Sequence, residues 1–208
     1  MIDIDVGFER VWVERFKGKV RTDVRKAERA GLVVESDASG RFVAEFYDLY
    51  LGWISRRAGA HGLPKSLMLQ RAEPLRKYQA VAEKLGSACR VWIARLNKEP
   101  VAAIITLIHG IYANYWRGYS NKELSGRVSA NHLLHRIAIE YACNAGCQYY
   151  NMGWSGTTSL AAFKRSFGAV PRQFPVYTFD RIPLTQIESL RTDLRRSVKR
   201  LLEHASRG

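Results

Sequence analysis

The stretch that most restricts the fold lies in the middle of the chain, where three strand-like runs follow one another. The runs read CRVWIARLN, EPVAAIITLIHG and IYANYWRGYS, and the turn signals KE and HG separate them. Runs rich in Val, Ile, Tyr and Trp that are joined by short polar turns form antiparallel hairpins. The sequence therefore predicts a three-stranded antiparallel meander within residues 89–120.

Helical periodicity surrounds this meander on both sides. The apolar spacing and the Gly and Pro breaks predict helices over 8–30, 41–58, 66–85, 129–145 and 157–167, and a last amphipathic helix. Short strands are predicted at LVVES, QYYNMG and RQFPVYTF. This order of elements predicts an α+β fold with one central mixed sheet. We divide the chain into a basic N-terminal helix, 1–31, an α+β domain, 32–180, and a C-terminal amphipathic basic helix, 181–208.

The charge balance is strongly basic. The sequence has 33 Lys and Arg against 19 Asp and Glu, a net charge of +14. Such a charge favours an anionic partner, which can be a phosphate-bearing donor, an RNA or an acidic surface. A solvated basic surface without a dedicated ligand is the alternative.

Cysteine usage and hydropathy point to a cytoplasmic protein without a metal. Cys89, Cys143 and Cys147 lack the second Cys or His pair that a zinc site requires. Reduced thiols fit the cytoplasm. The longest apolar run, VAAIITLI, is too short to span a bilayer, and no signal peptide is present. We therefore expect a cytoplasmic location.

The first candidate for chemistry is the lysine in the run NMGWSGTTSLAAFKRSFGA, at 151–169. On a helical wheel, Leu160, Phe163 and Phe167 define the buried face, and Lys164 lies at its edge. A lysine in that place can hold its ammonium in a partly dry cleft and stabilise an oxygen that becomes negative during acyl transfer. A lysine that merely covers the edge of the core is the alternative.

Two further features are candidates for binding. Ser129 is predicted as the N-cap of helix 129–145, whose first turn would present free N–H groups to a phosphate or carboxylate. In YANYWRGYS, strict alternation would place Tyr115, Arg117 and Tyr119 on one face of the strand, which lines a pocket or packs into the core.

Standard catalytic motifs are missing from the sequence. It has no G-x-S-x-G elbow, phosphate loop or His-Glu zinc helix. His132 and His135 lie three residues apart on one predicted helix, and we expect surface or cap roles for both. No general base can be assigned from the sequence.

Four ordered motifs cover most of residues 8–180: FKGKVRTDVRKAERAGLVVE, YANYWRGYS, SANHLLHRIAIEYACNAGCQYYNMG and AAFKRSFGA. Together they resemble the FemAB-like branch of the Gcn5-related N-acyltransferase (GNAT) superfamily. The resemblance implies a GNAT-like fold in which the acyl donor lies where the sheet opens. It makes 32–180 the acyltransferase domain.

The resemblance implies transfer of an acyl or aminoacyl group to an amine acceptor by direct attack, with acyl-CoA or aminoacyl-tRNA as co-substrate and no permanently bound cofactor. The amine would lose its proton to a substrate group or to water. By the same resemblance, Lys164 and Phe163 are the catalytic pair. We expect the donor at Ser129, Ala130, Asn131, Arg117 and Tyr119, and the acceptor at Asn151, Trp154, Tyr115 and Arg25.

Two departures from the family pattern affect this expectation. Family members commonly have two acyltransferase-like halves, and this chain resembles one, so a homodimer or a missing N-terminal half is implied. Asn151 stands where an Asp is frequent. A different class of function, an RNA-binding or scaffold module with a degenerate acyltransferase fold, fits the basic charge as well.

Overall fold

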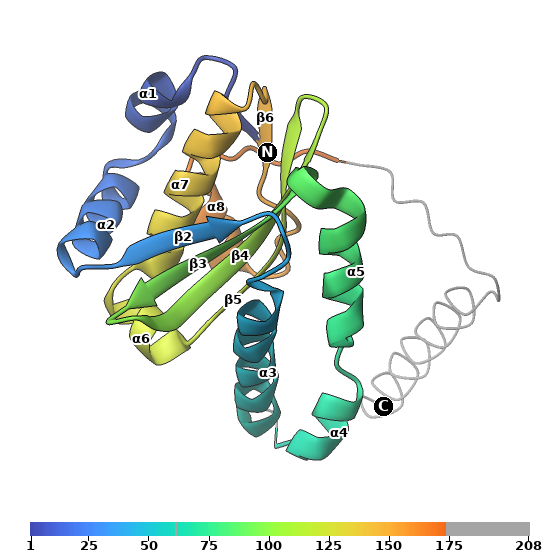
Figure 1. Ribbon diagram of the computed structural model, residues 1–208. Coiled ribbons are helices and arrows are strands. Elements are labelled where there is room, and N and C mark those ends of the chain that lie inside the picture. Colours follow the sequence, from blue (N-terminus) through green and yellow to red (C-terminus); the bar gives the residue numbers. More distant parts are fainter. Residues whose placement is uncertain (61, 174–208) are drawn as a thin grey trace, which may run out of the picture. The chain divides into compact units, whose positions relative to one another are not determined.

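The computed structural model describes residues 1–60 and 62–173. The chain divides into two compact units, Met1–Pro171 and Arg172–Gly208, and the first is described here. Its centre is a six-stranded sheet in the order β1-β6-β5-β4-β3-β2 (Figure 1). The strands are β1 (Ile2–Asp3), β2 (Val33–Asp37), β3 (Cys89–Leu96), β4 (Glu99–His109), β5 (Tyr112–Ser120) and β6 (Tyr149–Asn151).

The predicted meander forms the middle of this sheet. Strands β3, β4 and β5 are antiparallel neighbours, with Trp92 opposite Ile104 and Ile104 opposite Gly118. Strand β2 adds an antiparallel edge next to β3, whereas β6 runs parallel to β5. The predicted α+β class with one mixed sheet is therefore confirmed. The two-residue strand β1, which pairs with β6, was not predicted.

Helices cover the sheet, and several of their boundaries differ from the predicted ones. They are α1 (Phe8–Arg10), a π-helical stretch (Val11–Arg15), α2 (Gly18–Arg29), α3 (Val43–Ala60), α4 (Lys65–Gln70), α5 (Leu75–Leu85), a 3₁₀ turn (Gly86–Ala88), α6 (Lys122–Arg127), α7 (Ala130–Asn144) and α8 (Thr158–Ser166). The predicted strand 172–179 lies outside the described residues from residue 174 on. The predicted C-terminal helix, 181–208, lies outside them entirely.

Two predicted helices are interrupted for local reasons. The helix predicted over 8–30 opens at Phe16, which is extended and packs its ring 5.0 Å from Phe167. The next residue, Lys17, donates its backbone N–H to the Ser166 carbonyl at 2.8 Å. The helix predicted over 66–85 is divided at Pro74, because proline starts a helix far better than it continues one. A further helix, α6, which was not predicted from the sequence, lies between β5 and α7 and is capped by Asn121.

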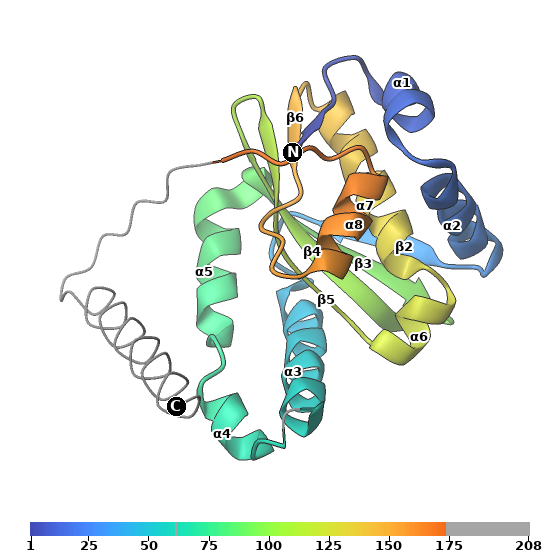
Figure 2. The same cartoon turned by 180° about the vertical axis from the view of Figure 1, so that it is seen from behind.

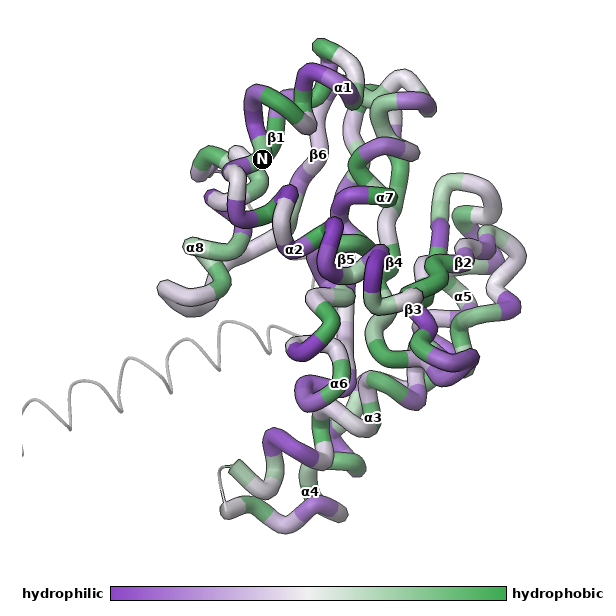
Figure 3. The backbone as a smooth tube through the Cα atoms, turned by 90° about the vertical axis from the view of Figure 1, so that its left-hand side faces the viewer, coloured by the Kyte–Doolittle hydropathy of each residue, from purple (hydrophilic) through white to green (hydrophobic). Residues whose placement is uncertain are grey.

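The two faces of the sheet bury separate apolar clusters. Helices α7 and α2 pack on the face that presents Trp92, Ala94, Ala102 and Ile104 (Figure 2). Helices α3 and α5 pack on the opposite face, which presents Val91, Ile93, Ala103 and Ile105. Residues 1–31, set apart in the sequence as a basic helix, contribute Val20 and Val24 to the α7 side. Hydrophobic and hydrophilic residues alternate along the tube in Figure 3, as helices that bury one face require.

A bulge in β5 reorients its side chains next to the point where β5 and β6 separate. Ile105 lies opposite Arg117 but Thr106 lies opposite Tyr115, so Trp116 is an extra residue. The strict alternation predicted for this strand is therefore wrong after Tyr115. The ladder between β5 and β6 ends at the pair Asn114 and Asn151, and from Tyr115 on the described part of β6 offers β5 no partner.

Candidate active site

Helix α8 is fixed at both ends by local contacts. Thr157 caps its start by accepting a hydrogen bond from the Leu160 backbone N–H. Gly168 ends it with φ +83°, and a Cβ atom at this glycine would lie 2.8 Å from the Arg15 carbonyl oxygen. Only glycine combines a left-handed backbone with such a close approach at low cost. The FGA sequence thus anchors α8 against the segment that precedes α2.

Lys164 points inward from α8 and is 5% exposed. Its ammonium donates to the carbonyls of Gly153 and Trp154, at 2.9 and 2.6 Å. Burial disfavours the charged form and lowers the pKa of Lys164 to about 8. Among the described residues, no carboxylate forms an ion pair with it.

The helical wheel had the orientation of α8 partly wrong. It predicted Leu160 inside and Lys164 at the edge, but Leu160 is 40% exposed and Lys164 is buried. Phe167 is fully buried as predicted, and Phe163 packs against the same cluster. The cause is hydrogen bonding: two carbonyls of the loop after β6 accept hydrogen bonds from the ammonium, which allows Lys164 to be buried.

Uncharged rings surround the lysine. His135 of α7 is 4% exposed, its ring lies 5.7 Å from Phe163, and its Nδ1 lies 3.3 Å from the Tyr150 hydroxyl. Burial, together with the nearby Lys164 ammonium, lowers the pKa of His135 to about 3, so its imidazole is neutral at pH 7. Burial also raises the pKa of Tyr115 to about 12, and the Tyr115 ring lies 4.9 Å from that of His135.

This position of His135 corrects the expectation of a surface or cap role. The one signal for it in the sequence is its i+3 spacing from His132, which also stacks on Phe167. That spacing is common on exposed helices as well, so it does not identify a buried residue.

Asn151 shapes the loop that holds the lysine. Its Oδ1 accepts from the Gly153 N–H at 3.0 Å, and its Nδ2 donates to the Asn114 Oδ1 at 3.2 Å. Gly153 has φ +72°, which turns its carbonyl toward Lys164. Trp154 contributes its carbonyl, while its side chain is 86% exposed. Asn151 and Trp154 thus lie beside the lysine.

The entry of α7 already has an acidic neighbour. Ser129 occupies the N-cap position, as predicted, but its φ is +54° and its hydroxyl does not cap the helix. The hydroxyl instead hydrogen-bonds to the Asp23 carboxylate of α2 at 3.3 Å, and the same carboxylate lies 3.5 Å from His132 Nε2. Ser129 and Ala130 are buried, and Asn131 follows them in the first turn. An anion arriving here would meet Asp23.

The remaining predicted site residues lie elsewhere. Arg117 and Tyr119 are on the α3 and α5 side of the sheet, where Arg117 pairs with Glu73 and Tyr119 packs against Phe46. Arg25 lies exposed on α2, in a shallow surface depression. The structure therefore brings together Lys164, Phe163, Tyr115, Asn151 and the Trp154 backbone, and it separates Arg117, Tyr119 and Arg25 from them.

The described residues contain neither a cluster of metal ligands nor a helix that could span a membrane. Within 1–60 and 62–173, no three His, Cys, Asp or Glu side chains gather as metal ligands would. In the same part of the chain, no helix has the length and apolar character needed to cross a bilayer.

Solved structures with this fold include several acyltransferases. The chain resembles FemX, with a TM-score of 0.61 at 15% identity over 80% of this chain. It spans 57% of the FemX chain. The aminoglycoside acetyltransferase AAC(6′)-Iy, and another aminoglycoside acetyltransferase from an uncultured soil metagenomic sample, each give a TM-score of 0.51 over 73% of this chain. Their identities to this chain are 11% and 14%.

The family assignment itself comes from the sequence match. Curated proteins gave no significant match to the chain. A family model described as an acetyltransferase (GNAT) domain, however, matches residues 14–165. This range includes every strand of the sheet but β1, and it includes Lys164. The protein belongs to the GNAT acetyltransferase domain family.

Proposed function

We propose that the protein is an N-acyltransferase that passes an acyl or aminoacyl group to an amine by direct attack of the amine on the donor carbonyl. The family membership supports this class of reaction. The observation on which the proposal rests is the buried ammonium of Lys164, which lies at the point where β5 and β6 part.

Within residues 1–60 and 62–173, the hydrogen bonds of Lys164 leave one of its N–H donors without a partner. An ammonium group has three N–H donors, and the Gly153 and Trp154 carbonyls accept two of them. The third is available for the carbonyl oxygen of the donor. Because the neighbouring His135 and Tyr115 are neutral, the ammonium acts on that oxygen in an environment that screens charge weakly.

The proposed reaction uses this arrangement as follows. The amine nitrogen bonds to the carbonyl carbon, the carbonyl oxygen takes up negative charge beside Lys164, and the C–S or C–O bond of the donor then breaks. The leaving group departs as a thiolate or an alkoxide that takes up a proton. His135 is buried, resists protonation and is hydrogen-bonded to the Tyr150 hydroxyl. We therefore do not assign it as the general base. The amine proton passes to a substrate group or to water.

Acyl-CoA is our first candidate for the donor. AAC(6′)-Iy, which has the same fold, was solved with a bisubstrate analogue that contains CoA. Aminoacyl-tRNA is the second candidate, supported by the net charge of +14, the FemAB-like resemblance and the exposed basic residues of α2. We further propose that the protein works in the cytoplasm and that a second copy or a second half completes the enzyme, as the coverage of FemX favours.

The test is the variant Lys164→Met, which keeps the length of the side chain and removes the charge. We expect kcat with acetyl-CoA and a panel of aminoglycoside and peptide amines to fall about 100- to 1000-fold, with KM little changed. Lys122→Met, on the exposed side of α6, is the matched control and should retain full turnover.

Two outcomes would overturn the proposal. Unchanged turnover in Lys164→Met would remove the role of the ammonium. Salt-sensitive binding of tRNA without turnover of either donor would favour the RNA-binding module instead.

A further inference from the structure

Arg117, on the side of the sheet opposite Lys164, makes only long hydrogen bonds to the described residues. Arg117 Nη2 lies 3.5 Å from Glu73 Oε1, and its Nη1 donates to the Trp116 carbonyl at 3.3 Å. Its guanidinium lies over the Trp116 ring, 5.4 Å from the ring centre, and 37% of the side chain is exposed. Charge-assisted arginine–carboxylate bonds are normally about 2.7–2.9 Å long and often bidentate. Arg117 therefore has unused capacity for a carboxylate.

Glu73 does not depend on Arg117. Its carboxylate also accepts from Lys77 Nζ at 2.5 Å and from the Tyr78 hydroxyl at 2.7 Å. Its backbone N–H donates to the Tyr50 hydroxyl, and its carbonyl accepts from the Tyr47 hydroxyl. Arg117 can thus exchange Glu73 for another carboxylate and leave Glu73 still paired.

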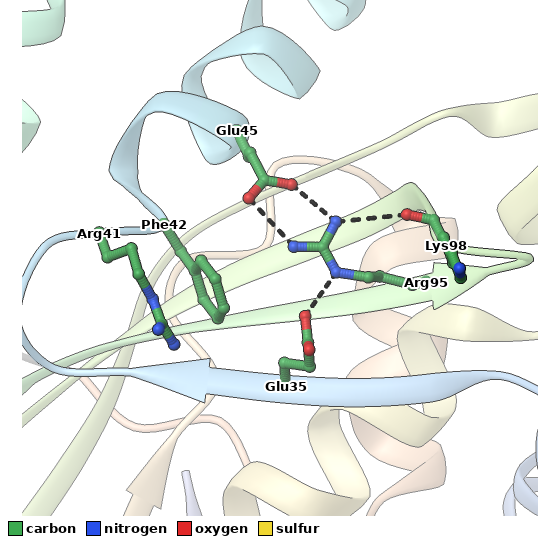
Figure 4. Close-up of a pocket in the computed structure, with 6 residues that line it drawn as sticks. All are labelled: Glu35, Arg41, Phe42, Glu45, Arg95 and Lys98. Carbon is green, nitrogen blue, oxygen red and sulfur yellow. Dashed lines mark hydrogen bonds and ion pairs between the residues drawn. The ribbon is translucent and has the colours of Figure 1, made fainter.

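Arg95 of β3 is the contrasting case, because two glutamates bind its guanidinium closely. Figure 4 shows its guanidinium between two glutamates. It binds both oxygens of Glu45, at 2.7 and 3.0 Å, and binds Glu35 at 2.5 Å. Only 17% of this side chain is exposed. Arg95 joins β2, β3 and α3, and it has no donor pair left for a ligand.

The location of Arg117 links it to the proposed reaction centre. Arg117 lies two residues after Tyr115 on β5, and the bulged residue Trp116 lies between them. A carbon added at Gly153 would lie 3.3 Å from the Tyr115 carbonyl, and Gly153 in turn holds Lys164. Two residues along a strand span about 7 Å. Arg117 and Lys164 lie on opposite sides of the sheet, so an acceptor held at Arg117 has to reach the lysine past the edge of β5, where β5 has no β6 partner beyond Asn114.

Aromatic rings flank the arginine. Tyr119 lies 4.7 Å from Tyr50 and 5.5 Å from Trp53, measured between ring centres, and Trp53 is 36% exposed. Trp53 and the half-buried Tyr119, which Tyr50 supports from the core, provide an apolar surface for the carbon chain of a ligand whose charged end meets Arg117.

We propose that Arg117 binds the carboxylate of the acceptor, so that the substrate amine and a carboxylate belong to one molecule, as in an amino acid or a peptide. The inference rests on the proposed function, because it names the class of acceptor for that reaction. The carboxylate displaces Glu73 from the guanidinium and forms two parallel N–H···O bonds.

The experiment compares acceptors that differ only in this charge. Nα-acetyl-lysine and Nα-acetyl-lysinamide present the same amine with and without a carboxylate, and glycylglycine and glycylglycinamide do so at another spacing. With acetyl-CoA, kcat/KM of the wild type should favour the acids by about tenfold to a hundredfold. Arg117→Gln should bring that ratio close to one, and Arg117→Lys should give an intermediate ratio. The control Arg95→Lys should leave the ratio unchanged.

A binding measurement separates this inference from the proposed function. Calorimetric titration of the acids and amides needs no turnover, and the acids should bind more tightly to the wild type but not to Arg117→Gln. Such binding without turnover would contradict the proposed function and leave the Arg117 site standing. Equal binding and equal turnover of acids and amides would overturn the Arg117 inference alone. A stronger, Arg117-dependent preference for phosphoethanolamine would overturn the carboxylate assignment.

Discussion

The two sides of the sheet hold their cations in different ways. On the α7 and α8 side, backbone carbonyls bind Lys164 among neutral rings, and no described carboxylate pairs with it. On the α3 and α5 side, carboxylates bind Arg95 and Arg117. Carbonyl dipoles satisfy the hydrogen bonds of a cation without cancelling its charge, whereas carboxylates do both. The type of partner thus distinguishes Lys164, for which we propose a chemical role, from the two arginines held in ion pairs.

Arg117 lies between these two extremes. Arg95 is bidentate and mostly buried, whereas Arg117 has one long contact to a glutamate that other donors already satisfy. The contrast indicates that the same side of the sheet contains a structural ion pair and an exchangeable one.

The largest effect on stability is expected where α8 is anchored, because that anchor places Lys164. Gly168→Ala combines a left-handed φ with a Cβ atom 2.8 Å from the Arg15 carbonyl oxygen. We expect the free energy of unfolding to fall by about 3 kcal/mol, the sum of backbone strain and overpacking. Urea unfolding at pH 7 measures this loss.

Gly146→Ala is the matched control for this prediction. Gly146 has φ +77°, but nothing lies within 4 Å of the position of its Cβ. It should lose only the strain, about 1 kcal/mol. Equal losses in the two variants would show that the contact with Arg15 does not anchor α8.

The fold followed from the sequence because periodicity is a local property. The meander, the helix at 129–145 and the motifs around Lys164 each appear within one stretch of chain. The bulge at Trp116 was not predictable, since one extra residue in a strand leaves no mark on a pattern of alternating aromatic and polar residues.

The depth of Lys164 was not predictable either. It depends on two carbonyls from a loop about ten residues away, and a helical wheel contains no information about them. In the same way, the Asp23 carboxylate beside Ser129 comes from a helix more than a hundred residues earlier. Side chains that depend on distant backbone polar groups need the structure.

The second prediction compares the two arginines through stability. Arg95→Lys loses the bidentate bond to Glu45 and the bond to Glu35, which an ammonium cannot reproduce together. We expect the free energy of unfolding to fall by about 1–2 kcal/mol. Arg117→Lys should change it by less than about 0.5 kcal/mol, because Glu73 keeps its bonds to Lys77 and Tyr78. A larger loss in Arg117→Lys than in Arg95→Lys would make Arg117 the structural residue.

The smallest effect is expected from a negative charge placed beside Lys164, which has no ion-pair partner among the described carboxylates. Because burial holds the pKa of Lys164 at about 8, its ammonium loses a proton as the pH rises past that value, and kcat should decline there. Asn151→Asp adds a carboxylate that can still accept from the Gly153 N–H, and the carbonyl of this same glycine binds Lys164. The new charge favours the ammonium, raises the pKa of Lys164 and should move the declining limb upward by about half a pH unit.

The kcat profile from pH 6 to 10 measures the shift. The control is Asn144→Asp, the same change at the exposed end of α7, which should leave the limb in place. A limb that stays where it is in Asn151→Asp would mean that another group, and not the lysine held by the two carbonyls, sets the alkaline decline.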